Sequence, residues 1–343
     1  MPTLMWAFFL LSAKISPMTK NRFALGVVAA ALSIFIWGIT FVSTKYLLRS
    51  FSSYEILVLR FLLAYAGLWL LRPKLLRLSE KKHEIYFVLA GLSGVTAYQF
   101  MENLAISYTS ASNVSIIVSI CPIFTAIFSQ IFLKEKQLTL SFVLGFLLAI
   151  FGVALVSFNG VVELHFSPKG DFLAFGSALC WGVYSLCVSK INALKLDSIQ
   201  TTRRIFFWAV ILMFPIGIFS LVTNASALQA DSASPSQIAV IFDSAVNESR
   251  FSNPLNWLNL CFLGLGASAF CFAAWNFACD SVGTVRATVG IYLIPVVTIV
   301  FAYLALGESI SLMGAAGAAI TIAGLFVSEI KKTRMSTDER GEF

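Results

Sequence analysis

Charged residues and histidines are scarce in this chain of 343 residues. Only 12% of the residues are charged, and there are two histidines, His83 and His165. A soluble domain has about 25% charged residues. Both histidines stand alone outside the apolar segments, so no catalytic histidine pair lies among them. No glycine-rich loop ending in Lys-Ser or Lys-Thr occurs, which argues against direct use of ATP. These absences weigh against a membrane enzyme, and we expect no catalytic residues.

Cysteine is also sparse, and its spacing carries no ligand pattern. The six cysteines lie within or at the ends of apolar segments, and none forms a Cys-x-x-Cys pair. A disulfide framework or a zinc site is therefore not indicated, and the residues are interpreted as small apolar packing residues. We expect neither a metal nor another cofactor.

Apolar residues, by contrast, make up 58% of the chain and form long uninterrupted runs. A run of about 20 residues is long enough for a helix to cross a hydrocarbon layer of about 30 Å. The sequence therefore predicts an all-α integral membrane protein. Its ten transmembrane helices are expected at residues 24–47, 54–72, 84–107, 112–133, 139–158, 171–191, 199–223, 255–280, 285–306 and 312–330.

The second half of the chain repeats the first. Asn103–Glu135 aligns without a gap on Asn276–Glu308, 173 positions later, and seven residues are identical. An earlier stretch repeats at an offset of 144, with Trp37 on Trp181 and Arg60 on Arg204. The two offsets differ by 29 residues, about the length of the polar insert at 224–253, so one insertion explains both. We infer a duplication of five helices.

Lysine and arginine predict the orientation of the chain. With the N-terminus inside, 17 of the 24 lie in inner segments, four in outer segments and three within helices. Because positive charge concentrates in cytoplasmic loops, both termini are expected in the cytoplasm. Five is an odd number of crossings, so the second repeat must be inverted relative to the first. The net charge of +7 is thus assigned to topology and not to nucleic-acid binding.

These features divide the chain into five expected regions. Residues 1–21 are an N-terminal cytoplasmic extension, in which 1–17 either precede a natural start at Met18 or form an interfacial segment. Residues 22–160 form the first repeat. Residues 161–330 form the second, with the insert 224–253 outside the cytoplasm. Residues 331–343 form a cytoplasmic tail.

Several repeated motifs resemble the EamA repeat of the drug/metabolite transporter superfamily. The runs that carry the resemblance are Phe35–Phe41, Leu59–Ala64, Asn103–Ser112, Pro122–Thr125, Leu133–Glu135, Ile294–Thr298 and Leu306–Glu308. The resemblance covers about residues 22–330. Lys134 stands where the family usually has glycine, and the insert is longer than expected. The resemblance implies ten helices and exchange of small metabolites across a cytoplasmic membrane, often as export.

Polar side chains deep in the helices mark the expected transport cavity, because polar groups in lipid are costly and should face the protein interior. Tyr98 and Glu102 are four residues apart, as are Gln99 and Asn103, so they form one broad polar face. The residues proposed to line the cavity are Trp37, Thr40, Tyr98, Gln99, Glu102, Asn103, Ser115, Trp181, Tyr184, Trp275, Asn276, Thr288 and Tyr292.

Other readings of these residues remain open. Asn103 and Asn276 could instead bridge helices, and Glu102 could bond a neighbouring helix or couple transport to protons. Arg60 and Arg204 are interpreted first as anchors at the interface and second as groups that attract a carboxylate. Pro122 and Pro295 are expected to kink their helices, as gate hinges or only as packing features.

We expect a secondary transporter that exports amino acids or similar amphipathic solutes by alternating access, located in the cytoplasmic membrane. The alternative is an uptake or exchange permease for S-adenosylmethionine or a nucleotide derivative. The expected partners are a small metabolite and the lipid bilayer, with no nucleic acid, and a monomer is compatible with the sequence. Substrate, direction and proton coupling are not readable from these residues.

Overall fold

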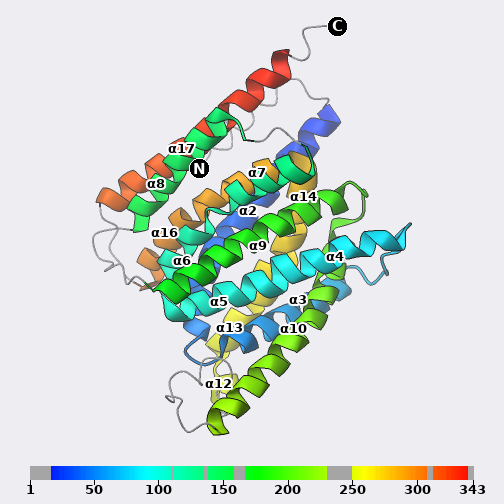
Figure 1. Cartoon of the computed structure of the whole chain (residues 1–343), viewed down its shortest axis with the longest axis vertical. Helices are drawn as coiled ribbons and strands as arrows, with labels where there is room; N and C mark the ends of the chain where they lie inside the picture. Colours follow the sequence, from blue (N-terminus) through cyan, green and yellow to red (C-terminus); the bar gives the residue numbers. More distant parts are fainter. Residues whose placement is uncertain are drawn as a thin grey trace.

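The computed structural model describes residues 17–109, 111–134, 138–157, 167–229, 249–306 and 312–338, and the elements in these ranges are all helical. Residues 1–16, most of the insert and the last five residues lie outside these ranges, as do Glu135, His165 and Glu308. Figure 1 shows long helices crossing one another in a bundle, with α8 and α17 together on one flank.

Ten helical segments correspond to the ten predicted crossings. Those of the first repeat are α2 (Pro17–Leu47), α3 (Ser53–Leu71), α4 with α5 (Glu84–Ala90 and Tyr98–Tyr108), α6 with α7 (Ala111–Val118 and Cys121–Phe132) and α8 (Leu140–Ser157). Those of the second are α9 (Pro168–Asn192), α10 (Ser198–Gln229), α13 with α14 (Pro254–Cys261 and Cys271–Val282), α15 with α16 (Thr284–Val289 and Ile294–Leu306) and α17 (Leu312–Asp338). The predicted ten-helix membrane fold is confirmed.

Length and composition support a membrane location independently of the repeat. In the described residues, five helices are long and apolar enough to cross a bilayer: Asn21–Leu47, Ser53–Leu71, Val114–Phe132, Pro168–Asn192 and Pro254–Val282. Large apolar side chains also face outward, with Leu147 57% and Phe172 77% exposed. Such a surface suits lipid and would promote aggregation in water.

Two helices extend beyond their predicted ends. α10 continues to Gln229, into the segment expected to be a polar insert, and α17 continues to Asp338, into the expected tail. Residues 249–252 of the insert form a further short helix, α12 (Ser249–Ser252). Hydropathy locates the end of the apolar stretch, but a helix can continue into water wherever the backbone conformation remains favourable.

The two repeats pack so that helices of one repeat lie against helices of the other. α2, the first helix of repeat one, lies against α14 and α16 of repeat two, and α9, the first helix of repeat two, lies against α5 and α7 of repeat one. In the same way α3 contacts Phe262–Phe270, while α10 contacts Gly91–Ala97. Each contact therefore has a counterpart with the repeats interchanged, as an inverted duplication requires.

Backbone irregularities also occur in pairs. Gly91–Ala97, between α4 and α5, and Phe262–Phe270, between α13 and α14, are both π-helical. The next crossing of each repeat is interrupted as well, at residues 119–120 between α6 and α7 and by a 3₁₀ turn at Gly290–Leu293 between α15 and α16. π-helical turns occur frequently at functional sites. Broken helices in transporters commonly border the substrate site.

Pro122 and Pro295 lie at these interruptions and not in the middle of a continuous helix. Pro122 is in the first turn of α7, and Pro295 is the second residue of α16. At the start of a helix the missing N–H has no intrahelical partner to lose. The expectation of a kink within one helix is therefore replaced by a break between two helices. The hinge role of both prolines remains a prediction.

α8 and α17, the last helices of the two repeats, approach each other through glycine. A Cβ atom added to Gly152 would lie 2.4 Å from the backbone nitrogen of Thr321, and one added to Gly324 would lie 2.4 Å from that of Ala149. Small residues allow helices to pack closely where lipid supplies no hydrophobic driving force between them. Figure 1 shows this pair side by side on one flank of the bundle.

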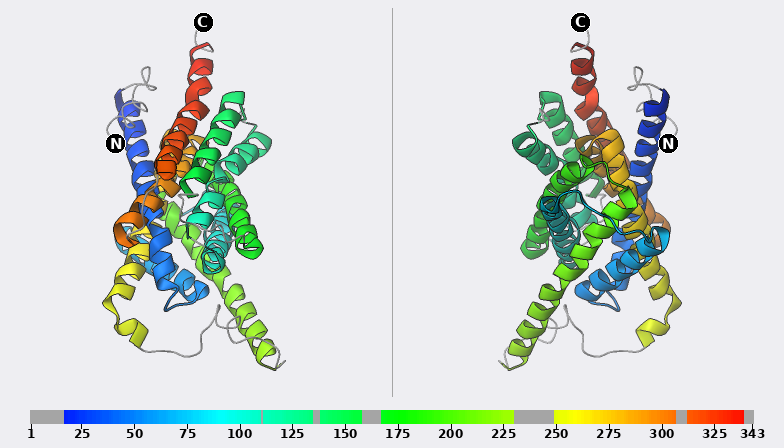
Figure 2. Two further views of the ribbon diagram at one scale, coloured as in Figure 1. Left: turned by 90° about the vertical axis from the view of Figure 1, so that its left-hand side faces the viewer. Right: turned by 90° about the vertical axis from the view of Figure 1, so that its right-hand side faces the viewer.

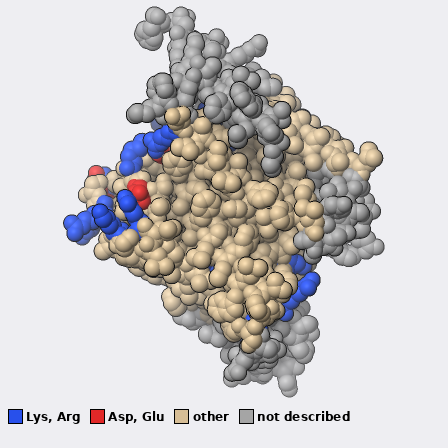
Figure 3. Space-filling model, turned by 180° about the vertical axis from the view of Figure 1, so that it is seen from behind, with Lys and Arg blue, Asp and Glu red and all other residues tan. Residues whose placement is uncertain are grey.

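On the face drawn in Figure 3, the charged side chains lie mainly near two opposite edges. In Figure 3 the lysines and arginines gather at the left edge and at the lower right, and the broad surface between them is uncharged. The start of α2 and the end of α17 lie at the same end of the molecule (Figures 1 and 2). This arrangement agrees with an even number of crossings.

We expect Gly152→Leu to loosen the α8–α17 pair. The new side chain would collide with the backbone of Thr321, and overpacking of this kind costs about 1–3 kcal/mol. Thermal unfolding of the purified protein in detergent should shift downward by several degrees. Leu147→Ala, on the lipid-facing side of the same helix, is the matched control. Equal melting temperatures for both variants and the parent would contradict the close packing.

Candidate functional site

A small cavity lies between the two repeats. Its volume is about 20 Å³, which suffices for one or two water molecules. The first repeat contributes Trp37, Thr40, Phe41, Arg60, Tyr98, Gln99, Glu102, Val118 and Cys121, and the second contributes Trp181, Phe272, Ile291 and Ile294. Six of the thirteen residues predicted to line a cavity are in this set: Trp37, Thr40, Tyr98, Gln99, Glu102 and Trp181.

Arg60 borders the cavity, whereas its first interpretation was an anchor whose side chain extends to the interface. It is 2% exposed and does not extend to the interface. Its Nε donates to Ser268 Oγ at 2.6 Å, and its Nη1 donates to Gln99 Oε1 at 2.8 Å. Arg60 thus links α3 to the π-helical segment of repeat two and to α5. Its identity with Arg204 in the repeat marked it as important, but not as a cavity residue.

Glu102 brings the opposite charge to the same cavity. The residue is 5% exposed, and its carboxyl group hydrogen-bonds to the hydroxyl of Tyr98, one turn earlier on α5. Arg60 lies close enough to interact with Glu102 electrostatically. The predicted polar face of α5 therefore does meet the cavity through Tyr98, Gln99 and Glu102.

Aromatic rings surround these polar groups. The Trp37 ring centroid lies 5.4 Å from that of Trp181 and 5.0 Å from that of Trp275, and Tyr98 lies 5.1 Å from Trp181. The indole of Trp37 donates from Nε1 to the carbonyl of Ala267 at 2.9 Å. The indole Nε1 of Trp181 is buried and has no hydrogen-bond partner among the described residues. Trp275 lies behind this first layer of rings.

Asn276 bridges helices and does not line the cavity. Its Oδ1 accepts from the Tyr184 hydroxyl at 2.9 Å, its Nδ2 donates to Thr202 Oγ1 at 2.8 Å, and its carbonyl accepts from Asn192 at 3.4 Å. These bonds join α14 to α9 and α10. Asn276 therefore fits the bridging alternative, and Tyr184 is one of its bridging partners.

The remaining predicted residues are buried away from the cavity. Asn103 donates to the carbonyl of Ser53 at 3.3 Å, and its Oδ1 has no partner among the described residues. Thr288 bonds the carbonyl of Thr284 within its own helix at 2.7 Å. Ser115 is 2% exposed, and Tyr292 packs near Phe146 with ring centroids 6.3 Å apart.

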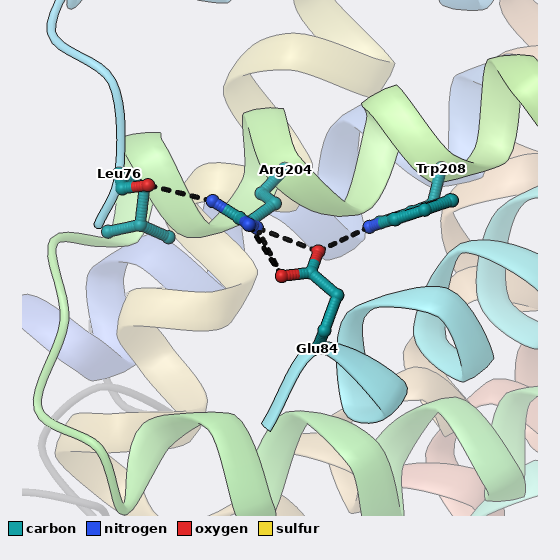
Figure 4. A network of polar contacts seen from close by, with 4 residues as sticks. All are labelled: Leu76, Glu84, Arg204 and Trp208. Carbon is teal, nitrogen blue, oxygen red and sulfur yellow. Dashed lines mark hydrogen bonds and ion pairs between the residues drawn. The ribbon is translucent and has the colours of Figure 1, made fainter. Parts of the chain in front are cut away.

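Arg204 has a different environment from its repeat partner. Its guanidinium forms a bidentate ion pair with Glu84, with Nε–Oε1 at 2.8 Å and Nη2–Oε2 at 2.5 Å, and donates to the carbonyl of Leu76 at 2.7 Å. Trp208 donates to the same carboxylate at 2.5 Å. Figure 4 shows the closed network, which ties α10 to α4 and to the preceding loop. Arg204 is an anchor, as first interpreted.

Ionic contacts also connect helices at the two ends of the molecule. Asp280, at the end of α14, binds both Arg22 of α2 and Lys195 of the α9–α10 connection. At the opposite end, Arg250 of the insert pairs with Glu55 at 2.8 Å, and Glu55 also completes the capping box of α3. These contacts join helices at opposite ends of the bundle. In the described residues no group of three or more potential metal ligands occurs.

The sequence pattern that defines the EamA-like transporter family matches the chain twice, over residues 24–158 and 168–329. The chain belongs to this family. Membership makes it a multi-pass membrane transporter and not an enzyme, and the double match follows the duplication. A protein of solved crystal structure shares the fold of this EamA-family chain with a TM-score of 0.64, at 17% identity, covering 90% of this chain and 98% of that one.

Relatives of known sequence cover most of the chain. An uncharacterized transporter of Archaeoglobus fulgidus is 29% identical, with 88% of this chain and 96% of the relative aligned. The uncharacterized transporter YyaM of Bacillus subtilis is 25% identical, over 92% and 97%. A probable terminal-alkyne amino-acid exporter of Streptantibioticus cattleyicolor is 23% identical, over 70% and 71%.

We expect Asn276→Ala to reduce stability more than it alters solute binding. The variant loses two side-chain hydrogen bonds between helices and leaves Thr202 and Tyr184 without their partner. Such bonds in membranes are worth about 0.6–1.7 kcal/mol each. Thermal unfolding of Asn276→Ala should therefore occur several degrees lower than that of the parent. The unfolding temperature of Tyr184→Phe, which loses one of the two hydrogen bonds, should lie between those of Asn276→Ala and the parent. Parent-like stability with a tenfold higher KM would instead return Asn276 to the binding site.

Proposed function

We propose that this protein is a secondary transporter that exports amino acids or similar amphipathic solutes by alternating access. The observation that carries the proposal is a buried cavity, between inverted repeats, that combines Arg60 and Glu102 with aromatic rings. A carboxylate, an amine and an apolar body each have a complementary group there. The resemblance to a probable amino-acid exporter supports the same solute class.

The small volume of the cavity supports an alternating mechanism. Pockets for small solutes usually have about 300–1,000 Å³, far more than one or two waters occupy. The cavity must therefore widen to admit a solute, and ionic contacts at both ends of the bundle must yield in turn. The interrupted crossings supply suitable elements, because Val118 and Cys121 border one break and Ile291 and Ile294 border the other. Pro122 and Pro295 are the proposed hinges.

The proposed location is the cytoplasmic membrane, with both termini in the cytoplasm. The skew of positive charge supports this orientation. The connection between α3 and α4 would then be cytoplasmic, and the base of the insert near α12 would be outside.

Labelling from either side of the membrane tests this orientation. Ser79→Cys lies in the exposed α3–α4 connection and Ser252→Cys in exposed α12. A membrane-impermeant maleimide added to intact cells should label Ser252→Cys and should label Ser79→Cys only after the membrane is opened. The parent, whose six cysteines are buried or half-buried, gives the background. The reverse labelling pattern would contradict the proposed orientation.

Transport in proteoliposomes tests the function. Labelled amino acids, S-adenosylmethionine and a nucleotide should be screened with and without a pH gradient, and we expect saturable flux for amino acids. Saturable flux for S-adenosylmethionine or the nucleotide alone would favour the alternative permease. No saturable flux for any of these solutes would contradict the proposal.

Trp37→Ala should lower kcat/KM for the transported solute by about tenfold or more. The variant removes a ring that borders the cavity and holds Trp181 and Trp275 in place. A tenfold loss corresponds to about 1.4 kcal/mol. Trp257→Ala is the control, because Trp257 is 45% exposed and does not border the cavity. Parent-like kinetics for Trp37→Ala would count against this cavity as the solute path.

A further inference from the structure

Arg60 and Glu102 face one cavity without forming an ion pair. The guanidinium of Arg60 is bonded to two neutral side chains, Ser268 and Gln99, and the carboxyl group of Glu102 is bonded to Tyr98. Arg60 lies close enough to Glu102 for the two charges to interact, but no ion pair joins them. Elsewhere, Arg204 closes directly on Glu84 and Arg250 on Glu55, whereas buried Arg203 donates to the neutral carbonyls of Arg72 and Lys74.

Some hydrogen-bond donors beside the cavity have no partner among the described residues. The hydrogen bonds of Arg60 run from Nε and Nη1, so Nη2 has no partner among the described residues. The indole Nε1 of Trp181, which also borders the cavity, is likewise without one. Buried donors usually have partners, and a buried charge is costly unless it is paired. Unsatisfied donors beside a cavity are therefore candidates to bind a solute.

We infer that Arg60 and Glu102 recognise the two ends of a zwitterion: Arg60 binds the carboxylate of the solute, and Glu102 binds its ammonium group. The guanidinium presents its donors in a planar fork that suits a carboxylate. The apolar remainder of the solute would lie against Trp37, Trp181 and Phe272. This inference rests on the proposed function and assigns its specificity to named residues.

The arrangement also explains how solutes with a single charge would be rejected. A simple carboxylic acid would satisfy Arg60 but would lie beside the carboxyl group of Glu102. A simple amine would satisfy Glu102 but would lie beside Arg60. Only a solute with both groups neutralises both residues, so each incorrect solute leaves a buried charge uncompensated.

Matched solutes test the inference on the unaltered protein. Phenylalanine, 3-phenylpropionate and phenethylamine share one ring and differ only in their charged groups. Leucine, 4-methylpentanoate and 3-methylbutylamine form a second set without a ring. Competition against the labelled amino acid should be measured in detergent, where permeation of the amine and the acid through a bilayer cannot interfere. We expect each amino acid to compete at least tenfold better than its two single-charge analogues.

Two variants then assign each group to a residue. Glu102→Gln should narrow the gap in competing affinity between the amino acid and its acid analogue by about tenfold and leave the gap between the amino acid and its amine analogue unchanged. Arg60→Gln should narrow the gap to the amine analogue by about tenfold and leave the gap to the acid analogue unchanged. Arg49→Gln and Glu80→Gln remove the same charges from exposed positions outside the cavity and should leave both gaps unchanged. If a single variant fails to fold, the double variant Arg60→Gln/Glu102→Gln, which removes both charges together, should lose both preferences.

The outcomes separate the inference from the function on which it rests. Saturable amino-acid transport with single-charge analogues that compete equally well would overturn the inference and leave the transporter intact. The same holds if both gaps persist in the Arg60 and Glu102 variants. Absence of saturable flux for every amino acid would overturn the amino-acid proposal and this inference with it.

Discussion

Lipid offers no hydrogen-bond partners, and this constraint organises the polar groups of the protein. Each polar group in a crossing must find its partner within the same helix, on another helix or in an enclosed aqueous space. Asn276 finds partners on two other helices, and Trp37 finds a carbonyl in the π-helical segment of repeat two. The exchange of partners between the inverted repeats creates these interfaces. Trp181, whose indole Nε1 has no partner among the described residues, borders the cavity together with Arg60.

The irregular backbone belongs to the same organisation. The π-helical segments and the broken crossings lie where the two repeats meet, and not on the lipid-facing flank formed by α8 and α17. Backbone that departs from the α-helix is tolerated at membrane depth only where protein or enclosed water covers it. The regular helices α8 and α17 thus pack against each other, whereas the irregular segments where the repeats meet shape the cavity.

The sequence predicted the crossings and the duplication because both leave signals in single residues and in spacing. Apolar runs locate a helix in lipid, and the seven identities between Asn103–Glu135 and Asn276–Glu308 locate the repeat. The polar face of Tyr98, Gln99 and Glu102 was recognisable for the same reason. The different surroundings of Arg60 and Arg204 could not be predicted, because they depend on which helix lies opposite each arginine. The hydrogen-bond partners of Asn103 and Asn276, which occupy equivalent positions of the repeat, could not be predicted for the same reason.

Arg60 and Arg204 descend from one position of the repeat, yet one borders the cavity and the other is locked in a closed ion pair with Glu84. In a protein with two identical inverted halves, the inward-open and outward-open forms would be related by a two-fold rotation about an axis in the membrane plane and would have equal free energy. In the proposed alternating cycle, the unequal division of polar groups would give the two forms different free energies, and the empty carrier would rest preferentially on one side. Solute gradients would still determine the direction of net flux, but this bias would set which half of the cycle is slower.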